Sequence, residues 1–319
     1  MKSGRSKLAQ FAFVALVATH LASSNASAQP PAACSIDTAP AATLLLPYFE
    51  VNLARPQGMN TIFTINNASN SAILAHISFW SDLSVPTLDF NVYLTGFDSE
   101  TFDLRRLFTT GFVPRNASDG QDPTDTISPQ GDFSQDLNFA SCAGQLPLPP
   151  LPQSFIDHIR AAHTGQSSAI LSGKCAGRNY GDRVARGYVT IDTVNNCTLR
   201  FPSDAGYFGP DGDATDQNAL FGDVLYVDAF RGRAVESNLV PIQAFATNPE
   251  TSTSGSYTFY GRYVGWSGAD HREPLPTNFA VRYNNLRPST TDLVVWRDSK
   301  LSVAPFNCGT TPAGFPRPN

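Results

Sequence analysis

Residues 73–80 read ILAHISFW, and this stretch decides the fold class because an apolar residue occupies every second position from Ile73 to Phe79. Successive side chains of a β-strand point to opposite faces of a sheet, so the alternation predicts a strand with one face on a core. Residues 88–97 repeat the alternation from Leu88 onward and close at Gly96. The period of two predicts successive β-strands rather than helices.

The same reasoning extends along the chain. Strands are expected over residues 43–53, 61–65, 73–80, 88–97, 186–194, 223–230, 239–246, 256–264 and 292–296. Pro47 lies inside the first of these and cannot donate to a central ladder, which indicates an edge strand or a bulge. One helix is expected over residues 154–164, with Ser154 as its N-cap, apolar residues at helical spacing and Gly165 as its stop.

Composition favours the same class of fold. Charged residues make up only 15% of the chain, and there are 23 Gly and 24 Pro residues. Asp outnumbers Glu 22 to 5, and only Lys174 and Lys300 follow the first 28 residues. Lys and Glu are typical of exposed helix faces, whereas Asp, Gly and Pro are typical of turns. We therefore predict a mainly β protein, an antiparallel β-sandwich of the Ig-like or jelly-roll type with one short helix and long loops.

Residues 114–153 interrupt the strand pattern with a Pro- and Asp-rich loop. The sequence leaves two domain organisations open for residues 29–319. They form either one sandwich or two β units, over about 40–113 and 183–308, joined by this loop and the short helix at 154–164.

Residues 1–28 have the pattern of a signal peptide that is removed on export. Three cations precede a largely apolar run over residues 8–21, and Ala26-Ser27-Ala28 fits a small-x-small cleavage site. That run is shorter than the roughly 20 residues of a membrane span, and no later segment is long enough. We expect the mature chain to be secreted, periplasmic or at the cell surface, without a membrane span.

The charge of the chain bears on its partners. The formal net charge is −5, and loss of the three cations of the leader makes it −8. An acidic chain repels phosphate backbones, so a nucleic-acid partner is not expected. No phosphate-binding glycine motif is present, and the sequence indicates no other partner.

All five cysteines lie beyond the leader. An exported chain permits disulfides, and an odd number leaves at least one thiol over. The first pairing to consider joins Cys142 with Cys175, which bracket a Pro-rich loop and the short helix, and Cys34 with Cys308, which lie near the two ends of the chain. Cys197 is then the free thiol. No two cysteines have the Cys-x-x-Cys spacing typical of zinc sites.

Three stretches of the chain carry a resemblance to other proteins. They are ATLLLPYFE at residues 42–50, VPTLDFNVYLTG at residues 85–96 and TFYGRY at residues 258–263. Together they resemble a group of uncharacterised exported bacterial proteins, over most of the mature chain. The resemblance implies a bacterial exported protein and supplies no activity. Members of that group continue past the point where this chain ends, so a truncated chain would lack the last strands of a sheet.

The strongest catalytic pattern is Gly-Trp-Ser-Gly-Ala at residues 265–269, which resembles the nucleophile elbow of the α/β-hydrolases and is followed by Asp270 and His271. In that motif a helix starts directly after the Ser and supplies backbone N–H groups for an oxyanion. Here two prolines follow instead, and an Asp and a His directly beside the Ser cannot fold back as its triad. Ser267, Asp270 and His271 are therefore an alternative catalytic set, and no catalytic residue is assigned.

An acidic loop at residues 203–222 is the candidate for a metal site. Several carboxylates in one loop are what a hard cation such as calcium requires, although the spacing departs from the EF-hand pattern. The candidate ligands are Asp204, Asp211, Asp213, Asp216 and Asp223. Asp-rich turns are also common in β proteins, so we expect a solvated turn and assign no cofactor besides this calcium candidate.

A carbohydrate or polymer surface is a third candidate, because aromatic rings stack on the apolar faces of sugars. The aromatic residues concerned are Tyr257, Phe259, Tyr260, Tyr263 and Trp266. Aromatic residues with a period of two in a strand are also typical of a core. His76 lies opposite the apolar face of its strand, and we expect it to be a partly exposed surface residue.

These observations predict an exported non-catalytic protein, structural or ligand-binding, built on a β-sandwich. Sandwiches commonly bind through their loops, and the acid–base pairs of an enzyme are not evident. The alternatives are a secreted hydrolase and a calcium- or carbohydrate-binding module.

Overall fold

The computed structural model describes residues 39–114, 142, 146, 148–209, 211–245, 258–261, 270–274 and 304–310. The strands in this part of the chain are β1 (Thr43–Asn52), β2 (Met59–Asn67), β3 (Ile73–Ser81), β4 (Pro86–Leu94), β5 (Ser99–Asp103), β6 (Val184–Val194), β7 (Leu220–Asp228), β8 (Arg233–Asn238) and β9 (Val240–Ile242). The helices are α2 (Leu104–Thr110) and α3 (Gln153–His163).

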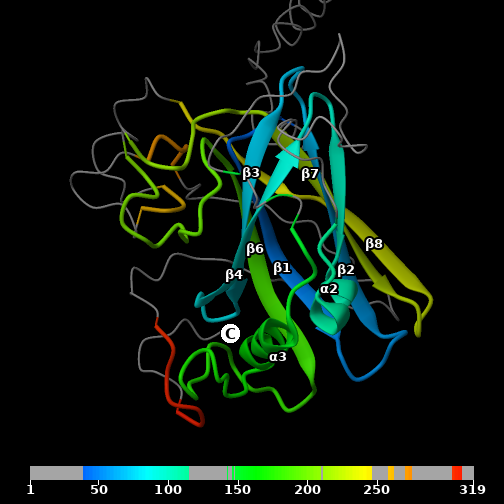
Figure 1. The fold of residues 1–319 in the computed structure, drawn as a ribbon. Coiled ribbons are helices and arrows are strands. Elements are labelled where there is room, and N and C mark those ends of the chain that lie inside the picture. Colours follow the sequence, from blue (N-terminus) through cyan, green and yellow to red (C-terminus); the bar gives the residue numbers. More distant parts are fainter. Residues whose placement is uncertain are drawn as a thin grey trace, which may run out of the picture. The chain divides into compact units, whose positions relative to one another are not determined.

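The strands form two antiparallel sheets that pack face to face (Figure 1). One sheet has five strands in the order β4-β3-β6-β1-β9, and the other has four in the order β5-β2-β7-β8. This arrangement confirms the prediction of a mainly β, antiparallel β-sandwich.

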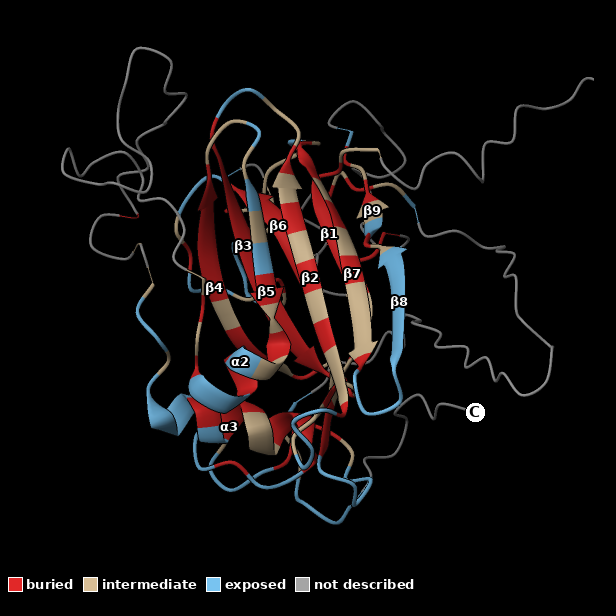
Figure 2. Cartoon of the chain, turned by 90° about the vertical axis from the view of Figure 1, so that its right-hand side faces the viewer, coloured by how far each residue is buried: buried red, intermediate tan, exposed pale blue. Residues whose placement is uncertain are grey.

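The main core lies between the inner faces of the two sheets, where Figure 2 shows alternating buried residues. Ile77 and Phe79 of β3 pack there with Phe63 of β2, as the alternation predicted. The bulge indicated by Pro47 is also present, because the register of β1 against β6 shifts between Leu46 and Phe49.

The two candidate β units are interleaved in the same sheets. β6 lies between β3 and β1, and β7 pairs with β2 along its whole length. Strands from before and after the 114–153 loop therefore share one core, so these strands do not form two separate units.

Several expected elements differ from the observed ones. β5, β8 and α2 were not predicted, and only β9 forms within the strand expected at 239–246. Within the strand expected at 256–264, the described residues form an isolated bridge and a turn, with the Gly261 N–H donating to the Thr258 carbonyl. The strand expected at 292–296 lies outside the described residues.

The helices cap one end of the sandwich. Asp103 is the N-cap of α2 and accepts hydrogen bonds from the backbone N–H groups of Arg105 and Arg106, while Gly111 ends the helix with a φ of 68°. The expectation of a single helix is therefore wrong. The N-cap of α3 is Pro152 rather than Ser154, which lies inside the helix, because Pro favours the extended conformation that precedes a first turn.

Two disulfides are present, and they join Cys142 to Cys197 and Cys175 to Cys308. The expected pairing is therefore wrong. Distance along the chain guided that expectation, whereas the backbone of Cys175 pairs with that of Phe306 in an isolated bridge and brings Cys308 close. Cys34 lies outside the described residues.

Candidate functional site

A row of polar side chains crosses the outer face of the five-stranded sheet. Asn91 of β4 lies opposite His76 of β3, His76 lies opposite Asp192 of β6, and Asp192 lies opposite Thr43 of β1. Ser78, Asp89 and Thr190 form the adjacent row. We call these seven residues the outer-face cluster. Strand alternation gathers them, because they alternate with residues of the main core, as His76 does with Ala75 and Ile77.

The outer-face cluster is covered by segments that are distant in the sequence. Tyr207 and Tyr260 each donate a hydrogen bond of 2.8 Å to Oδ2 of Asp192, and Thr43 donates to Oδ1. Trp80 Nε1 donates to Thr190 Oγ1 at 2.9 Å. The outer face of this sheet is therefore a second buried layer rather than a solvent-facing surface.

A fully buried arginine, Arg272, lies against the outer-face cluster. Arg272 Nη2 lies 3.3 Å from Asp192 Oδ1, Arg272 Nη1 lies 3.3 Å from Asp270 Oδ1, and its guanidinium lies over the rings of Phe208 and Tyr260. Burial lowers the pKa of Arg272, but the two carboxylates outweigh burial and the net pKa is raised. Arg272 is therefore held in its charged form.

His76 is fully buried, so the expectation of a partly exposed surface histidine is wrong. Its Nδ1 lies 3.1 Å from Asn91 Oδ1, and its Nε2 lies 3.8 Å from Asp89 Oδ2. Burial raises the pKa of Asp89, a nearby Asp204 adds to the rise, and His76 opposes it. The alternation of β3 led to the wrong exposure for His76, because the segments that cover this face of the sheet come from distant parts of the sequence.

The alternative catalytic set is not assembled in the described part of the chain. Asp270 is fully buried, accepts from Thr258 Oγ1 and pairs with Arg272. His271 points elsewhere, and its Nδ1 contacts Asp216 Oδ2. Ser267 lies outside the described residues.

The candidate calcium ligands are held by separate partners. Asp213 accepts from Thr198 Oγ1 at 2.7 Å and from Arg200 Nη1 at 3.0 Å. Asp204 accepts from the backbone of Phe201, Asp216 contacts His271, Asp223 lies in β7, and Asp211 is exposed. Among the described residues, no group of three or more His, Cys, Asp or Glu side chains is placed to hold a metal ion.

The candidate aromatic surface is not exposed where it is described. Phe259 and Tyr260 are buried against Trp80 and Tyr188. Tyr257, Tyr263 and Trp266 lie outside the described residues. This part of the sequence therefore contributes two aromatic residues to a buried layer, in line with the core alternative.

Both histidines of α3 are buried and hydrogen-bonded around Thr87. His158 Nε2 donates to the Thr87 carbonyl at 3.0 Å, and its Nδ1 accepts from Ser168 Oγ at 2.7 Å. His163 Nδ1 donates to the Arg186 carbonyl at 2.8 Å, and its Nε2 lies 2.8 Å from Thr87 Oγ1, whose hydroxyl also donates to the Phe79 carbonyl at 3.1 Å. Because the Thr87 carbonyl only accepts, His158 donates from Nε2 and is satisfied in the neutral form. Burial lowers the pKa of His163 to about 4 and also lowers that of His158.

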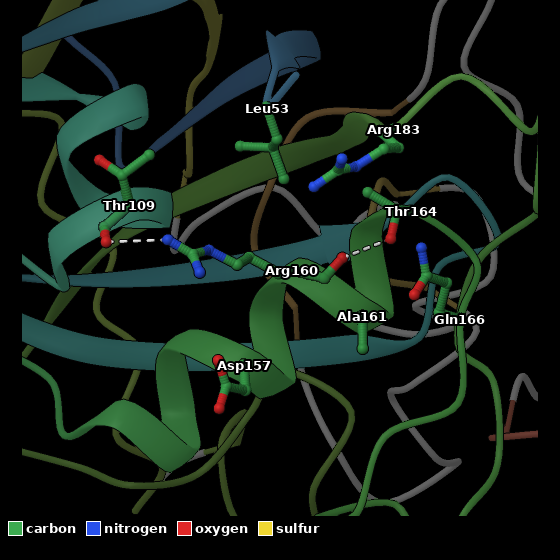
Figure 3. Close-up of a pocket in the computed structure, with 8 residues that line it drawn as sticks. All are labelled: Leu53, Thr109, Asp157, Arg160, Ala161, Thr164, Gln166 and Arg183. Carbon is green, nitrogen blue, oxygen red and sulfur yellow. Dashed lines mark hydrogen bonds between the residues drawn. The ribbon is translucent and has the colours of Figure 1, made fainter. Parts of the chain in front are cut away.

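Among the described residues, two cavities open at the end of the sandwich that carries α2, α3, the β1–β2 loop and the β7–β8 turn. We call it the helix end. The smaller cavity, of about 300 Å³, is shown in Figure 3. Arg160 crosses it and donates from Nε and Nη2 to the carbonyls of Phe108 and Thr109, at 2.5 and 2.8 Å, so two of its five N–H donors join α3 to α2.

The larger cavity has a volume of about 420 Å³ and lies between the ends of β1, β2, β6 and β7. Its charged lining residues are Glu50, Arg55, Asp182, Arg186, Asp228 and Arg231. Phe230 also lines it and is 66% exposed. The cavity size is within the roughly 300–1,000 Å³ of small-molecule sites.

The β1–β2 loop at this cavity is held by one side chain. Arg105 of α2 donates to the carbonyls of Asn52, Arg55, Gly58 and Met59 at 2.7, 3.0, 2.8 and 2.9 Å. A side chain at Gly58 would place its Cβ 2.9 Å from Cβ of Asn52, so the tight turn requires glycine. The loop therefore keeps a fixed conformation against α2.

The β7–β8 turn is fixed to the same loop. The Phe230 N–H donates to the Gln57 carbonyl at 2.7 Å, and the Arg55 guanidinium lies 5.2 Å from the centre of the Phe230 ring. Sequence reasoning missed this site, because Phe230 was expected at the end of a strand and no motif marks the convergence of the two loops.

In the part of the chain that the structure describes, these features define a class, a mainly β protein of two antiparallel sheets with two disulfides, a buried polar layer and two cavities at one end. No family model, no curated protein and no solved structure matches the chain. In the described part of the chain, neither helix has the length and apolar character that a membrane crossing requires.

Proposed function

We propose that this chain is an exported, non-catalytic protein that binds a ligand in the larger cavity of the helix end. The observation that carries the proposal is the fixed β1–β2 loop, in which four backbone carbonyls accept hydrogen bonds from the Arg105 guanidinium. Binding is favoured when the site is already ordered, because less conformational entropy is lost on association.

The larger cavity also has polar groups that are available to a ligand. Glu50 Oε2 accepts from the Tyr48 hydroxyl at 3.0 Å, while Oε1 has no hydrogen-bond partner among the described residues. Asn52 uses its Oδ1 on the backbone of the loop, which leaves its amide nitrogen to donate. Arg55 contacts the Phe230 ring and has no carboxylate partner in the described part of the chain. A few convergent polar groups beside an aromatic ring are typical of ligand sites.

Export is supported by the leader pattern of residues 1–28 and by the two disulfides. Disulfides persist in oxidising compartments and are rare in the cytosol. The proposed location is therefore the periplasm, the cell surface or the medium.

The test uses the disulfide-bonded mature protein and a defined panel of probes, namely neutral oligosaccharides, oligogalacturonates, free amino acids and short peptides. We expect at least one probe to bind with a Kd below about 1 mM by calorimetry. Glu50→Gln and Arg55→Gln should weaken that binding, whereas Arg233→Gln, outside the lining, should not. Failure of every probe to bind, or binding that the cavity variants leave unchanged, overturns the proposal.

A secreted hydrolase is the competing function, with Ser267, Asp270 and His271 as its residues. Asp270 and His271 are engaged by Arg272 and Asp216, which favours the non-catalytic proposal. A broad panel of hydrolase substrates decides between them. Turnover that is lost in Ser267→Ala, Asp270→Ala or His271→Ala would establish the hydrolase, and turnover that none of them changes would exclude this set.

A further inference from the structure

We propose that the ligand of the larger cavity is an uncharged carbohydrate, with one sugar ring stacked on Phe230. This inference rests on the proposed function and names the chemical class of its ligand. Three observations carry it: the exposed aromatic ring, the mixture of donors and acceptors beside it, and the charge balance of the lining.

Phe230 is the aromatic platform. It lies in the β7–β8 turn, is 66% exposed, and lines the cavity although no core contact requires an apolar residue there. Its backbone is fixed by the hydrogen bond to Gln57, so the ring projects from an ordered turn. An exposed ring held at a cavity edge offers an apolar face to the C–H groups of a sugar.

The polar groups beside Phe230 match hydroxyl groups. Glu50 Oε1 can accept a hydrogen bond, while the Asn52 amide and the Arg55 guanidinium can donate. A sugar hydroxyl both donates and accepts, so it pairs with both kinds of group. A ligand that only accepts would leave Glu50 without a partner.

The charges of the lining cancel. Asp182 is paired with Arg186 at 2.5 Å, and Asp228 is paired with Arg231 at 2.9 Å. The remaining charges are the carboxylate of Glu50 and the guanidinium of Arg55, and both line the same cavity. A cavity with equal numbers of acids and arginines attracts neither an anion nor a cation, which favours an uncharged ligand over a uronic acid chain.

A free amino acid is the main competing ligand, because its ammonium and carboxylate groups would match Glu50 and Arg55. The Phe230 ring distinguishes the two classes. A sugar ring needs it as a platform, whereas a zwitterion is held mainly by the two charges and depends strongly on salt.

The experiment titrates the disulfide-bonded mature protein with cello-, malto-, xylo- and chito-oligosaccharides, with oligogalacturonate and with free amino acids. We expect a neutral oligosaccharide to bind, with little change between low and high salt. Phe230→Ala should weaken that binding by about fivefold or more, the effect of losing an aromatic contact. Phe97→Ala is the matched control, because Phe97 is 70% exposed in the β4–β5 turn at the opposite end of the sandwich.

The outcomes separate the two proposals. Binding of oligogalacturonate or amino acids alone, through Glu50 and Arg55, overturns the assignment of an uncharged carbohydrate and leaves the proposed function intact. Neutral oligosaccharide binding that Phe230→Ala does not weaken also overturns the assignment. Failure of every probe overturns both.

Discussion

Asp192 is fully buried, and each of its carboxylate oxygens receives two donors. Oδ1 accepts from Thr43 and Arg272, and Oδ2 accepts from Tyr207 and Tyr260. A buried carboxylate is costly unless it is paired and hydrogen-bonded, and here the partners come from β1 and from three later segments, which contain Tyr207, Tyr260 and Arg272. The residue therefore ties these segments to the outer face of β6.

Replacing Arg272 tests whether this pairing stabilises the fold. Arg272→Met keeps much of the side-chain volume but leaves the buried carboxylates of Asp192 and Asp270 without their cation. We expect a loss of about 3–5 kcal/mol in the free energy of unfolding, measured with urea, because an uncompensated charge remains buried. Arg233→Met is the control, because Arg233 is exposed in β8 and has no carboxylate partner in the described part of the chain, so its loss should cost about 0.5 kcal/mol or less. Equal losses in the two variants would contradict the stabilising role of Arg272.

At the scale of elements, local patterns predicted the strands but not what covers them. The alternation in residues 73–80 correctly placed Ile77 and Phe79 in the core. It assigned His76 to solvent, because the segments that cover it are far away in the sequence and no local signal marks them. β8 was missed for the opposite reason, since an edge strand with exposed side chains has no alternation to detect.

The prediction of site residues was limited in the same way, because it used only residues that are close together in the sequence. Asp270 and His271 were selected because they adjoin Ser267, yet tertiary structure directs them to different partners. The larger helix-end cavity needs the ends of four strands and a guanidinium from α2, and this convergence becomes visible only once the sheet order is known. The spacing of residues along the chain does not show which turns meet in space, so the residues that line this cavity could not be selected from the sequence.

Arg105 links α2 to the β1–β2 loop, and its removal should loosen that loop. In Arg105→Ala, four carbonyls lose their shared donor, and we expect a loss of about 1–3 kcal/mol in stability. Amide hydrogen exchange should also accelerate in residues 53–58. Arg106→Ala is the control, because Arg106 is exposed and lies over the Phe112 ring. Unchanged exchange in Arg105→Ala would contradict the view that this side chain orders the cavity.

The histidines of α3 should make stability depend on pH. Burial lowers the pKa of His163 to about 4, below the unfolded value of about 6.5, so the folded state disfavours the proton. The stabilisation is complete above pH 6.5 and is lost as the pH falls toward 4, at about 1.4 kcal/mol per pH unit for this one group.

Urea unfolding at several pH values between 7.5 and 4.5 measures this dependence. His163→Asn retains an amide donor for the Arg186 carbonyl and does not titrate, so its stability should fall less steeply over the same range. A wild-type slope that His163→Asn leaves unchanged would show that other groups cause the acid sensitivity.

At the scale of the whole molecule, the disulfides join covering segments to one another. One connects Cys142, before α3, to Cys197 in the loop after β6, and the other connects Cys175, after α3, to Cys308. The closed loops are 55 and 133 residues long. Cross-links across loops of this length restrict the unfolded chain strongly, which stabilises the folded state.

The number of free thiols tests the pairing of the cysteines. The two bridges use four of the five cysteines and leave Cys34, so thiol titration of the denatured, unreduced protein should give one thiol per chain. Cys34→Ser should give none and keep the stability of the wild type. Reduction should destabilise both proteins by roughly 2–4 kcal/mol per bridge. Five thiols in the unreduced wild type would contradict both bridges, and a dimer on a non-reducing gel with no free thiol would show Cys34 in an intermolecular bond instead.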